Sequence, residues 1–158
     1  MAEPARRCWD ACAILRWLKE EPGWEDCRGV IQQAESGKLV LVVSALAIAE
    51  VLMVSGGTKI TREDSQTVRS FFEHEYIEVV SLTRPIAYRA QDLVWDHGVD
   101  PKDGVHVATA LALKVPRLDT FDKKLLSLTE KVGGAPTLVI GKPDIEYQQK
   151  LEEQAHDE

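Results

Sequence analysis

The apolar run LVLVV at residues 39–43 constrains the fold of this chain most. Five consecutive aliphatic residues, three of them β-branched valines, are typical of a strand that is buried on both faces. Such strands lie inside parallel sheets whose two faces are covered by helices. The run therefore predicts an α/β fold with a central, mainly parallel β-sheet flanked by α-helices.

Strand and helix patterns alternate along the rest of the sequence, as expected for such a sheet. We predict further strands at residues 6–9, 76–82, 117–121 and 137–141. We predict helices at residues 11–20, 24–36, 44–54, 61–74, 84–98 and 101–114, and a short helix after residue 122. The 158 residues show no repeat or low-complexity linker and fit a single domain, residues 1–143, followed by a tail, residues 144–158.

The net charge of −7 argues at first against a nucleic-acid partner, because phosphate binding usually draws on a surplus of lysine and arginine. The tail, however, holds six acidic residues and one lysine, a net charge of −5, which leaves −2 for residues 1–143. We expect the tail to be a solvated end, either partly helical or disordered. The charge of the domain itself therefore does not exclude a nucleic-acid substrate.

Four acidic residues stand at the predicted junctions of strands and helices. Asp10 and Asp122 follow strands directly, where an aspartate can cap the next helix. Asp103 falls in the first turn of a helix that Asp100 can cap, where a carboxylate also complements the helix dipole. Glu50 lies among apolar neighbours in a helix that we expect to be buried, so it must be paired with an arginine, protonated or bound to a cation.

These four positions can converge on one edge of a parallel sheet. Clustered carboxylates repel and raise one another's pKa unless a cation neutralises them. Oxygen ligands favour Mg²⁺ or Mn²⁺, and the sequence has no Cys/His set for a softer metal. The three cysteines fit reduced packing thiols; they are Cys8, Cys12 and Cys27.

His106 and Asp119 lie close in sequence to two of these acids, Asp103 and Asp122. His106 shares a helix face with Asp103, and we expect a hydrogen-bonded structural residue rather than a metal ligand. With the period of two of a strand, Asp119 points away from Asp122. We therefore predict that Asp119 is a surface charge, or a charge beside the ligands, and that Asp119→Ala mostly spares the activity that Asp122→Ala abolishes.

The sequence resembles the PIN-domain nucleases, most closely the toxin ribonucleases of VapBC-type toxin–antitoxin pairs. The resemblance rests on four motifs whose order and spacing cover about residues 6–140; they are WDACAIL, SALAIAEVL, DGVHVATALAL and LDTFDKKLL. It implies that one acid from each motif binds Mg²⁺, with Mn²⁺ as the alternative, in the active site; the four are Asp10, Glu50, Asp103 and Asp122. It also matches Thr120 to a threonine that supports the last acid, whereas helix capping suffices to explain Ser44.

The same resemblance implies a metal-dependent endoribonuclease with an RNA substrate, often a homodimer, that is inhibited by a cognate antitoxin. A PIN nuclease of RNA processing or DNA repair is an alternative. A receiver-like Mg²⁺-binding signalling domain is another alternative, because GKPD at 141–144 fits the lysine-proline step of such domains. A receiver also needs an aspartate directly after its central strand, whereas Thr83 directly follows the strand at residues 76–82. The basic residues near the motifs either bind phosphates or are solvated surface charges; they are Arg6, Arg7, Lys102, Lys123 and Lys124.

The longest apolar stretch, residues 39–54, is shorter than the ~20 residues of a membrane-spanning helix and contains Ser44 and Glu50. The N-terminal residues lack the apolar core of a signal peptide. We therefore expect a cytoplasmic protein with no membrane partner.

Overall fold

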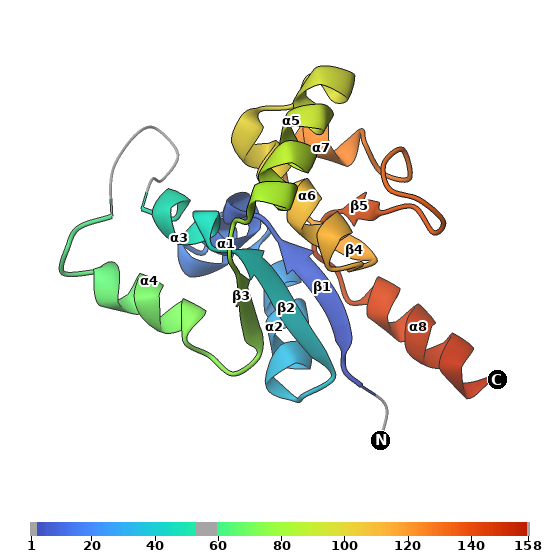
Figure 1. Ribbon diagram of the computed structural model, residues 1–158. Helices are drawn as coiled ribbons and strands as arrows, with labels where there is room; N and C mark the ends of the chain where they lie inside the picture. The colour runs from blue at the N-terminus through green and yellow to red at the C-terminus, as the bar shows by residue number, and fades with distance from the viewer. Residues whose placement is uncertain (1–2, 53–59, 158) are drawn as a thin grey trace.

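A five-stranded sheet forms the centre of the computed structural model, which describes residues 3–52 and 60–157 (Figure 1). The strands are β1 (Ala5–Trp9), β2 (Leu39–Ser44), β3 (Ile77–Val80), β4 (Arg117–Asp119) and β5 (Val139–Gly141). They lie in the order β3-β2-β1-β4-β5, and all four pairings are parallel. The predicted fold class is confirmed, and the described sheet is parallel throughout.

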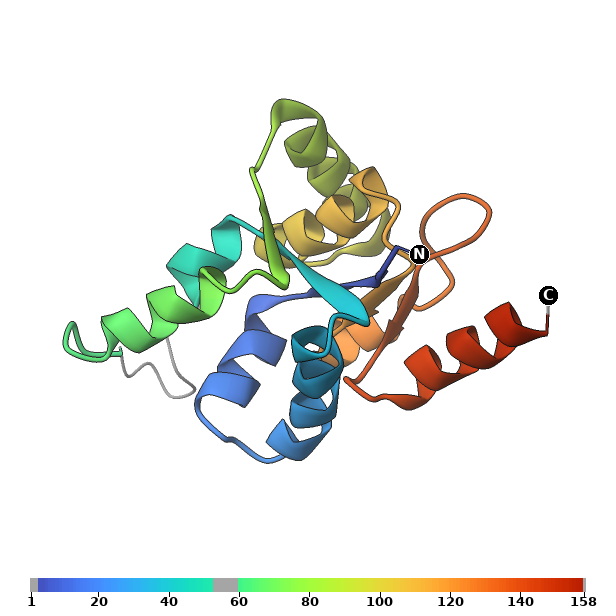
Figure 2. The same cartoon turned by 90° about the horizontal axis from the view of Figure 1, so that it is seen from below.

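Eight helices are described. They are α1 (Ala11–Leu18), α2 (Trp24–Glu35), α3 (Leu46–Glu50), α4 (Ser65–Phe72), α5 (Arg84–His97), α6 (Pro101–Ala112), α7 (Lys123–Leu126) and α8 (Glu146–His156). The sheet lies between α1 and α2 on one face and α5 and α6 on the other (Figure 2). No helix among the described residues is long and apolar enough to cross a membrane.

Alternating residues of the central strands supply the two halves of the core. Cys8 and Val42 pack with α5 and α6, whereas Trp9, Leu41 and Val43 pack with α1 and α2. All five side chains are 0% exposed. The LVLVV run is apolar at every position because both faces of β2 are covered, as predicted.

The segment after β2 differs from the prediction. The expected helix at residues 44–54 is the short α3, and residues 53 and 54 lie outside the described residues. Ser44 is the last residue of β2, and its Oγ accepts a hydrogen bond from the N–H of Leu46 at 3.2 Å. The helix expected to be buried also exposes Ile48 and Leu52, each 41% accessible.

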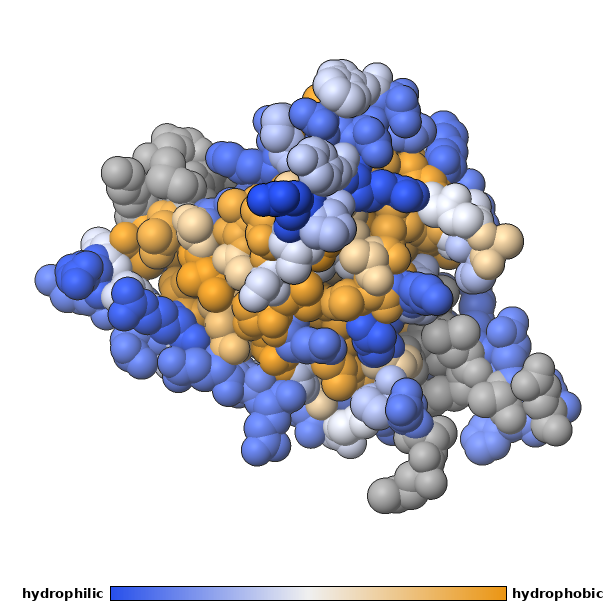
Figure 3. Space-filling model, in the orientation of Figure 1, coloured by the Kyte–Doolittle hydropathy of each residue, from blue (hydrophilic) through white to orange (hydrophobic). Residues whose placement is uncertain are grey.

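An apolar surface covers the face that carries β3, β2 and α3 (Figure 3). Its exposed large residues include Ile48, Leu52, Val79 and Leu82. Contiguous apolar surface of this kind usually marks a contact with another molecule.

The acidic tail is helical. Its helix, α8, projects from the body of the domain (Figures 1 and 2). Before α8 begins, Ile145 packs so closely on α2 that a Cβ on Gly29 would lie 2.8 Å from Ile145 Cγ2. Gly29 therefore lets the tail start directly against the domain.

Candidate active site

Five acidic side chains line one pocket of about 510 Å³: Glu21 and the four acids that the sequence analysis selected. Asp10 lies between β1 and α1, Glu50 ends α3, Asp103 lies in the first turn of α6, and Asp122 precedes α7. The structure therefore brings together the four acids that the sequence singled out.

Asp10 is held rigidly at the floor of this site. Its Oδ1 accepts from the N–H of Ala13 at 2.9 Å, as an N-cap does, and its Oδ2 accepts from Thr120 Oγ1 at 2.5 Å. The residue is 2% exposed. Burial raises the pKa of Asp10, against the opposing effects of His106, Thr120 and the Ala13 N–H.

Asp122 caps α7, as its place in the sequence predicts. Its Oδ1 accepts from the N–H groups of Lys124 and Leu125 at 2.9 and 3.1 Å. Its own N–H donates to Thr120 Oγ1 at 3.1 Å. The Thr120 hydroxyl thus connects the first and last acids, donating to the Asp10 carboxylate and accepting from the Asp122 backbone.

Glu50 is not buried among apolar neighbours, and its partner is not an arginine. The carboxylate is 18% exposed, and Oε1 accepts from His106 Nε2 at 2.7 Å. The expected burial of the helix around Glu50 is wrong, because α3 is short and one side faces solvent. An arginine pair was one of three alternatives, and the observed partner is His106 instead; cation binding by Glu50 stays a prediction. His106 is the hydrogen-bonded residue expected, and it is 1% exposed.

Opposing effects act on His106. Burial lowers its pKa, but the hydrogen bond to Glu50 and the negative charges of Asp10, Glu50 and Asp103 outweigh burial and raise it. Negative charge therefore dominates the electrostatics of the pocket.

Asp103 shows the effect of this crowding most clearly. Asp100 caps α6 by accepting from the N–H of Lys102 at 2.9 Å, so capping does not require Asp103. Burial, and then the charges of Asp122 and Asp10, raise the pKa of Asp103 to about 6. A cation in the pocket would relieve this repulsion.

The pocket fits a hard divalent cation in its chemistry. Its acidic groups supply oxygen donors, which Mg²⁺ and Mn²⁺ prefer. Within residues 3–52 and 60–157, no three histidine, cysteine or acidic side chains are already arranged to hold a metal ion. His106 Nε2 is hydrogen-bonded to Oε1 of Glu50, and the carboxylate has a second oxygen, Oε2, that can take part in binding a cation.

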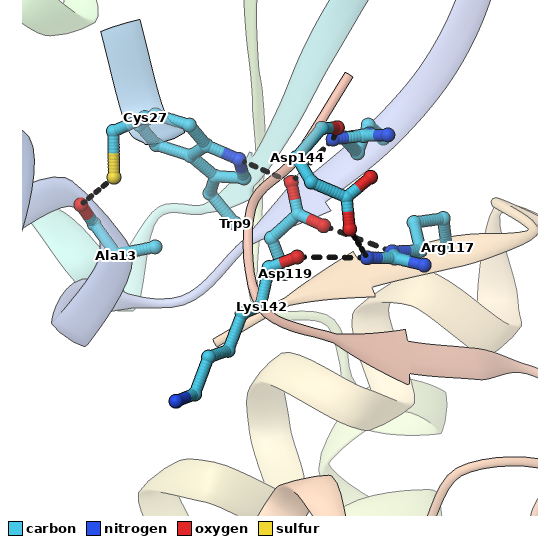
Figure 4. Close-up of polar contacts among 8 residues, drawn as sticks. Trp9, Ala13, Cys27, Arg117, Asp119, Lys142 and Asp144 are labelled. Atoms are coloured by element: carbon cyan, nitrogen blue, oxygen red, sulfur yellow. Dashed lines mark hydrogen bonds and ion pairs between the residues drawn. The ribbon is translucent and has the colours of Figure 1, made fainter. Parts of the chain in front are cut away.

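Asp119 is not a surface charge, which corrects the prediction. It is 0% exposed and forms a structural cluster with Trp9 and Arg117 (Figure 4), which Arg7 joins through a hydrogen bond. Its Oδ2 accepts from Trp9 Nε1 at 2.8 Å and from Arg7 Nη1 at 3.1 Å, and its Oδ1 accepts from Arg117 Nε at 2.9 Å. The two arginines also bind Asp144 at the start of the tail.

Both suggested roles of Arg7, phosphate binding and solvated surface charge, are therefore wrong, because Arg7 is 1% exposed and paired with Asp119. The other basic candidates differ in position. Lys102 lines the pocket, and Lys124 donates from Nζ to the carbonyl of Gly98. Lys123 is exposed and Arg6 is half-buried.

Arg16 is a pocket residue that the sequence analysis did not identify. It lies near the end of α1, where its sequence context suggests no more than a helix-terminal charge. Cys12 also lines the pocket, and all three cysteines are free, as expected.

Comparisons with known proteins agree with this geometry. The sequence matches the PIN domain family over residues 7–131. A comparison with curated proteins gave no match.

Three solved structures share the fold. A toxin–antitoxin complex from Klebsiella pneumoniae has a TM-score of 0.58 at 16% identity, over 77% of this chain and 90% of that one. VapC20 of Mycobacterium tuberculosis, described as a sarcin-ricin loop cleaving toxin, has a TM-score of 0.58 at 12% identity, over 74% and 90%. VapBC2 of Rickettsia felis, bound to a promoter DNA fragment, has a TM-score of 0.60 at 14% identity, over 88% and 99%.

The family match extends from β1 to beyond α7 and includes the four selected acids of the pocket. With its parallel sheet and its acids at the ends of strands and helices, this chain belongs to the PIN domain family.

Proposed function

We propose that this protein is a metal-dependent endoribonuclease that hydrolyses RNA phosphodiester bonds. The observation that carries the proposal is the shared pocket of Asp10, Glu50, Asp103 and Asp122. The four acids come from four separate helix ends, so the fold itself has to bring them together. No serine is among the described residues that line the pocket, and their one cysteine is Cys12. Burial raises the pKa of the Cys12 thiol, which makes it a poor nucleophile.

Mg²⁺, or Mn²⁺, would be held by carboxylate oxygens of Asp10, Glu50, Asp103 and Asp122. When bound, such an ion lowers the pKa of a water and offsets the charge that develops on the phosphodiester. Thr120 keeps the Asp10 carboxylate and the Asp122 backbone in a fixed relation through its hydroxyl. The carboxylates of the same two acids also accept hydrogen bonds from the backbone N–H groups of Ala13, Lys124 and Leu125, and these bonds limit their rotation.

Purified protein incubated with RNA and Mg²⁺ tests this function. We expect cleavage that chelation by EDTA stops and added Mg²⁺ or Mn²⁺ restores. Asp10→Asn should lose cleavage, because it removes a carboxylate from the pocket. It should keep its circular dichroism spectrum, because the side-chain oxygen of asparagine can still accept the hydrogen bond from the Ala13 N–H. Full activity of Asp10→Asn, or activity that survives chelation, contradicts the proposal.

The biological role that we infer is that of a VapBC-type toxin held inactive by a cognate antitoxin. Its support is the shared fold with the toxin–antitoxin complexes of Klebsiella pneumoniae and Rickettsia felis. Expression alone should arrest growth, and co-expression of a short neighbouring gene for a DNA-binding protein should relieve the arrest. Normal growth during strong expression of active enzyme would favour a PIN nuclease of RNA processing or DNA repair. The family match leaves the receiver-like alternative without support.

A cytoplasmic homodimer completes the proposal. The exposed apolar surface with Ile48, Val79 and Leu82 supports contact with another protein molecule. Light scattering on the purified chain should give twice the mass of 17.6 kDa. A monomer at all concentrations would contradict the dimer.

A further inference from the structure

Arg16 is the one arginine among the residues that line the acid pocket. Its guanidinium lies over the ring of Phe121, with 4.3 Å between Cζ and the ring centroid. Phe121 stands between Thr120 and Asp122, so the stacking connects the end of α1 to the segment that carries the last acid. The stacking therefore limits where the Arg16 guanidinium can lie relative to the pocket.

The turn after α1 supports the same arrangement from the other side. Arg16 Nη1 donates to the carbonyl of Pro22 at 2.7 Å. Gly23 has a φ of 101°, and a Cβ there would lie 3.0 Å from Phe121 Cε1. Because Gly23 has no side chain, the Phe121 ring fits between the turn and Arg16.

The acid near Arg16 does not neutralise it strongly. Glu21 Oε2 lies 3.9 Å from Arg16 Nε, which is too long for a hydrogen bond. The two side chains are 25% and 28% exposed, and ion pairs of such exposure contribute little. A guanidinium has five N–H donors. In Arg16 the Nε–H is buried and Nη1 donates to Pro22, so the donors that remain for a ligand are those on the two terminal nitrogens.

We propose that Arg16 binds a backbone phosphate of the RNA strand that enters the acid pocket. A pocket dominated by carboxylates repels a polyanion, and a fixed guanidinium offers both positive charge and paired donors for phosphate oxygens. Stacking on Phe121 orders the side chain before RNA arrives, which lowers the entropy lost on binding. This inference rests on the proposed nuclease function and adds a residue that positions the substrate.

The test measures binding of a short single-stranded RNA of mixed sequence in the presence of Mg²⁺. Asp122→Asn is used as the background so that the RNA is not cut, and Arg16→Met is added to it. Methionine keeps apolar packing on Phe121 and removes the charge and the donors. Lys19→Met is the matched control, because Lys19 is an exposed cation at the end of the same helix and does not line the pocket.

Arg16→Met should weaken RNA binding about tenfold at low salt. The slope of log affinity against log salt concentration should fall by about 0.7, the value for one phosphate contact on a single strand. Lys19→Met should leave the slope unchanged. In the active protein, Arg16→Met should raise KM for RNA more than it lowers kcat.

An unchanged slope in Arg16→Met, with or without loss of thermal stability, overturns the inference and leaves Arg16 as a structural brace of the turn. Equal losses of slope in Arg16→Met and Lys19→Met also overturn it, because they indicate diffuse attraction. Absence of cleavage by the unsubstituted protein counts against the nuclease function instead. The two failures are therefore distinguishable.

Discussion

The ends of β1 and β4 carry two groups of carboxylates that the protein treats differently. Asp119, on the α1 and α2 face, receives hydrogen bonds from Trp9, Arg7 and Arg117. Asp10 and Asp122, at the pocket, have hydroxyl and backbone N–H donors but no arginine bonded to their carboxylates among the contacts described. The structural acid has its cations within the fold, whereas the pocket acids leave negative charge for an external cation to neutralise.

Removing a pocket acid should have the largest effect on activity. Asp122→Asn keeps an N-cap acceptor for α7 but loses the charge that we propose binds the metal ion, so we expect cleavage to fall by about a thousandfold or more. The free energy of unfolding, measured in urea, should change by less than about 1 kcal/mol. RNA cleavage at saturating enzyme measures the first effect, and activity within tenfold of the original would remove Asp122 from the site.

Removing the structural acid should reverse this pattern. Asp119→Ala leaves Arg7 and Arg117 buried without their shared carboxylate, so we expect a loss of about 3–5 kcal/mol in the free energy of unfolding. The protein that remains folded should still cleave RNA. Urea denaturation measures the loss, with Asp26→Ala, an exposed acid of α2, as the control. A loss below about 1 kcal/mol would show that the cluster is dispensable.

Thr120 tests the connection between the pocket acids. Thr120→Val removes the donor to Asp10 and the acceptor for the Asp122 N–H, which should cost about 1–3 kcal/mol of stability and about tenfold in kcat. Thr109→Val is the control, because that buried hydroxyl bonds only to a carbonyl of its own helix. Equal effects of the two substitutions would contradict a specific role for Thr120.

The smallest effect should be on the dependence of stability on pH. The pKa of Asp103 lies at about 6 in the folded protein, above the ordinary 3.8, so the folded state binds a proton that the unfolded chain has released. Without metal, the free energy of unfolding should therefore fall as pH rises from about 4 to about 6. Asp103→Asn should reduce this slope and Asp96→Asn should not, as thermal melts in EDTA would show. A slope that Asp103→Asn leaves unchanged would contradict the repulsion described.

Much of this architecture could be predicted from the sequence. The run at 39–43 identified the central strand, and the positions of Asp10, Asp103 and Asp122 at element junctions located three acids, because local pattern decides which residues begin helices. Glu50 was located too, but its surroundings were not. An apolar sequence around Glu50 does not show that its helix ends at Glu50 itself and that Ile48 faces solvent.

Asp119, Arg7 and Arg16 show what local pattern leaves out. The ion pair of Arg7 with Asp119 joins residues 112 positions apart, and its formation depends on β1 and β4 being neighbours in the sheet. The period of a strand put Asp119 on the side away from Asp122, but it could not show that this side, which also carries Arg117, is buried. Arg16 lines the pocket in contact with Pro22 and Phe121, neither of which is its neighbour in the sequence.

The attachment of the C-terminal tail has a practical consequence for experiments. Arg7 and Arg117 bind Asp144, and Ile145 packs on Gly29, so the chain is anchored just before α8 begins. Beyond that anchor, α8 extends away from the domain and from the acid pocket (Figures 1 and 2). A fluorescent label or surface tether attached near His156 would therefore allow the proposed binding of RNA and antitoxin to be measured while leaving both carboxylate groups undisturbed.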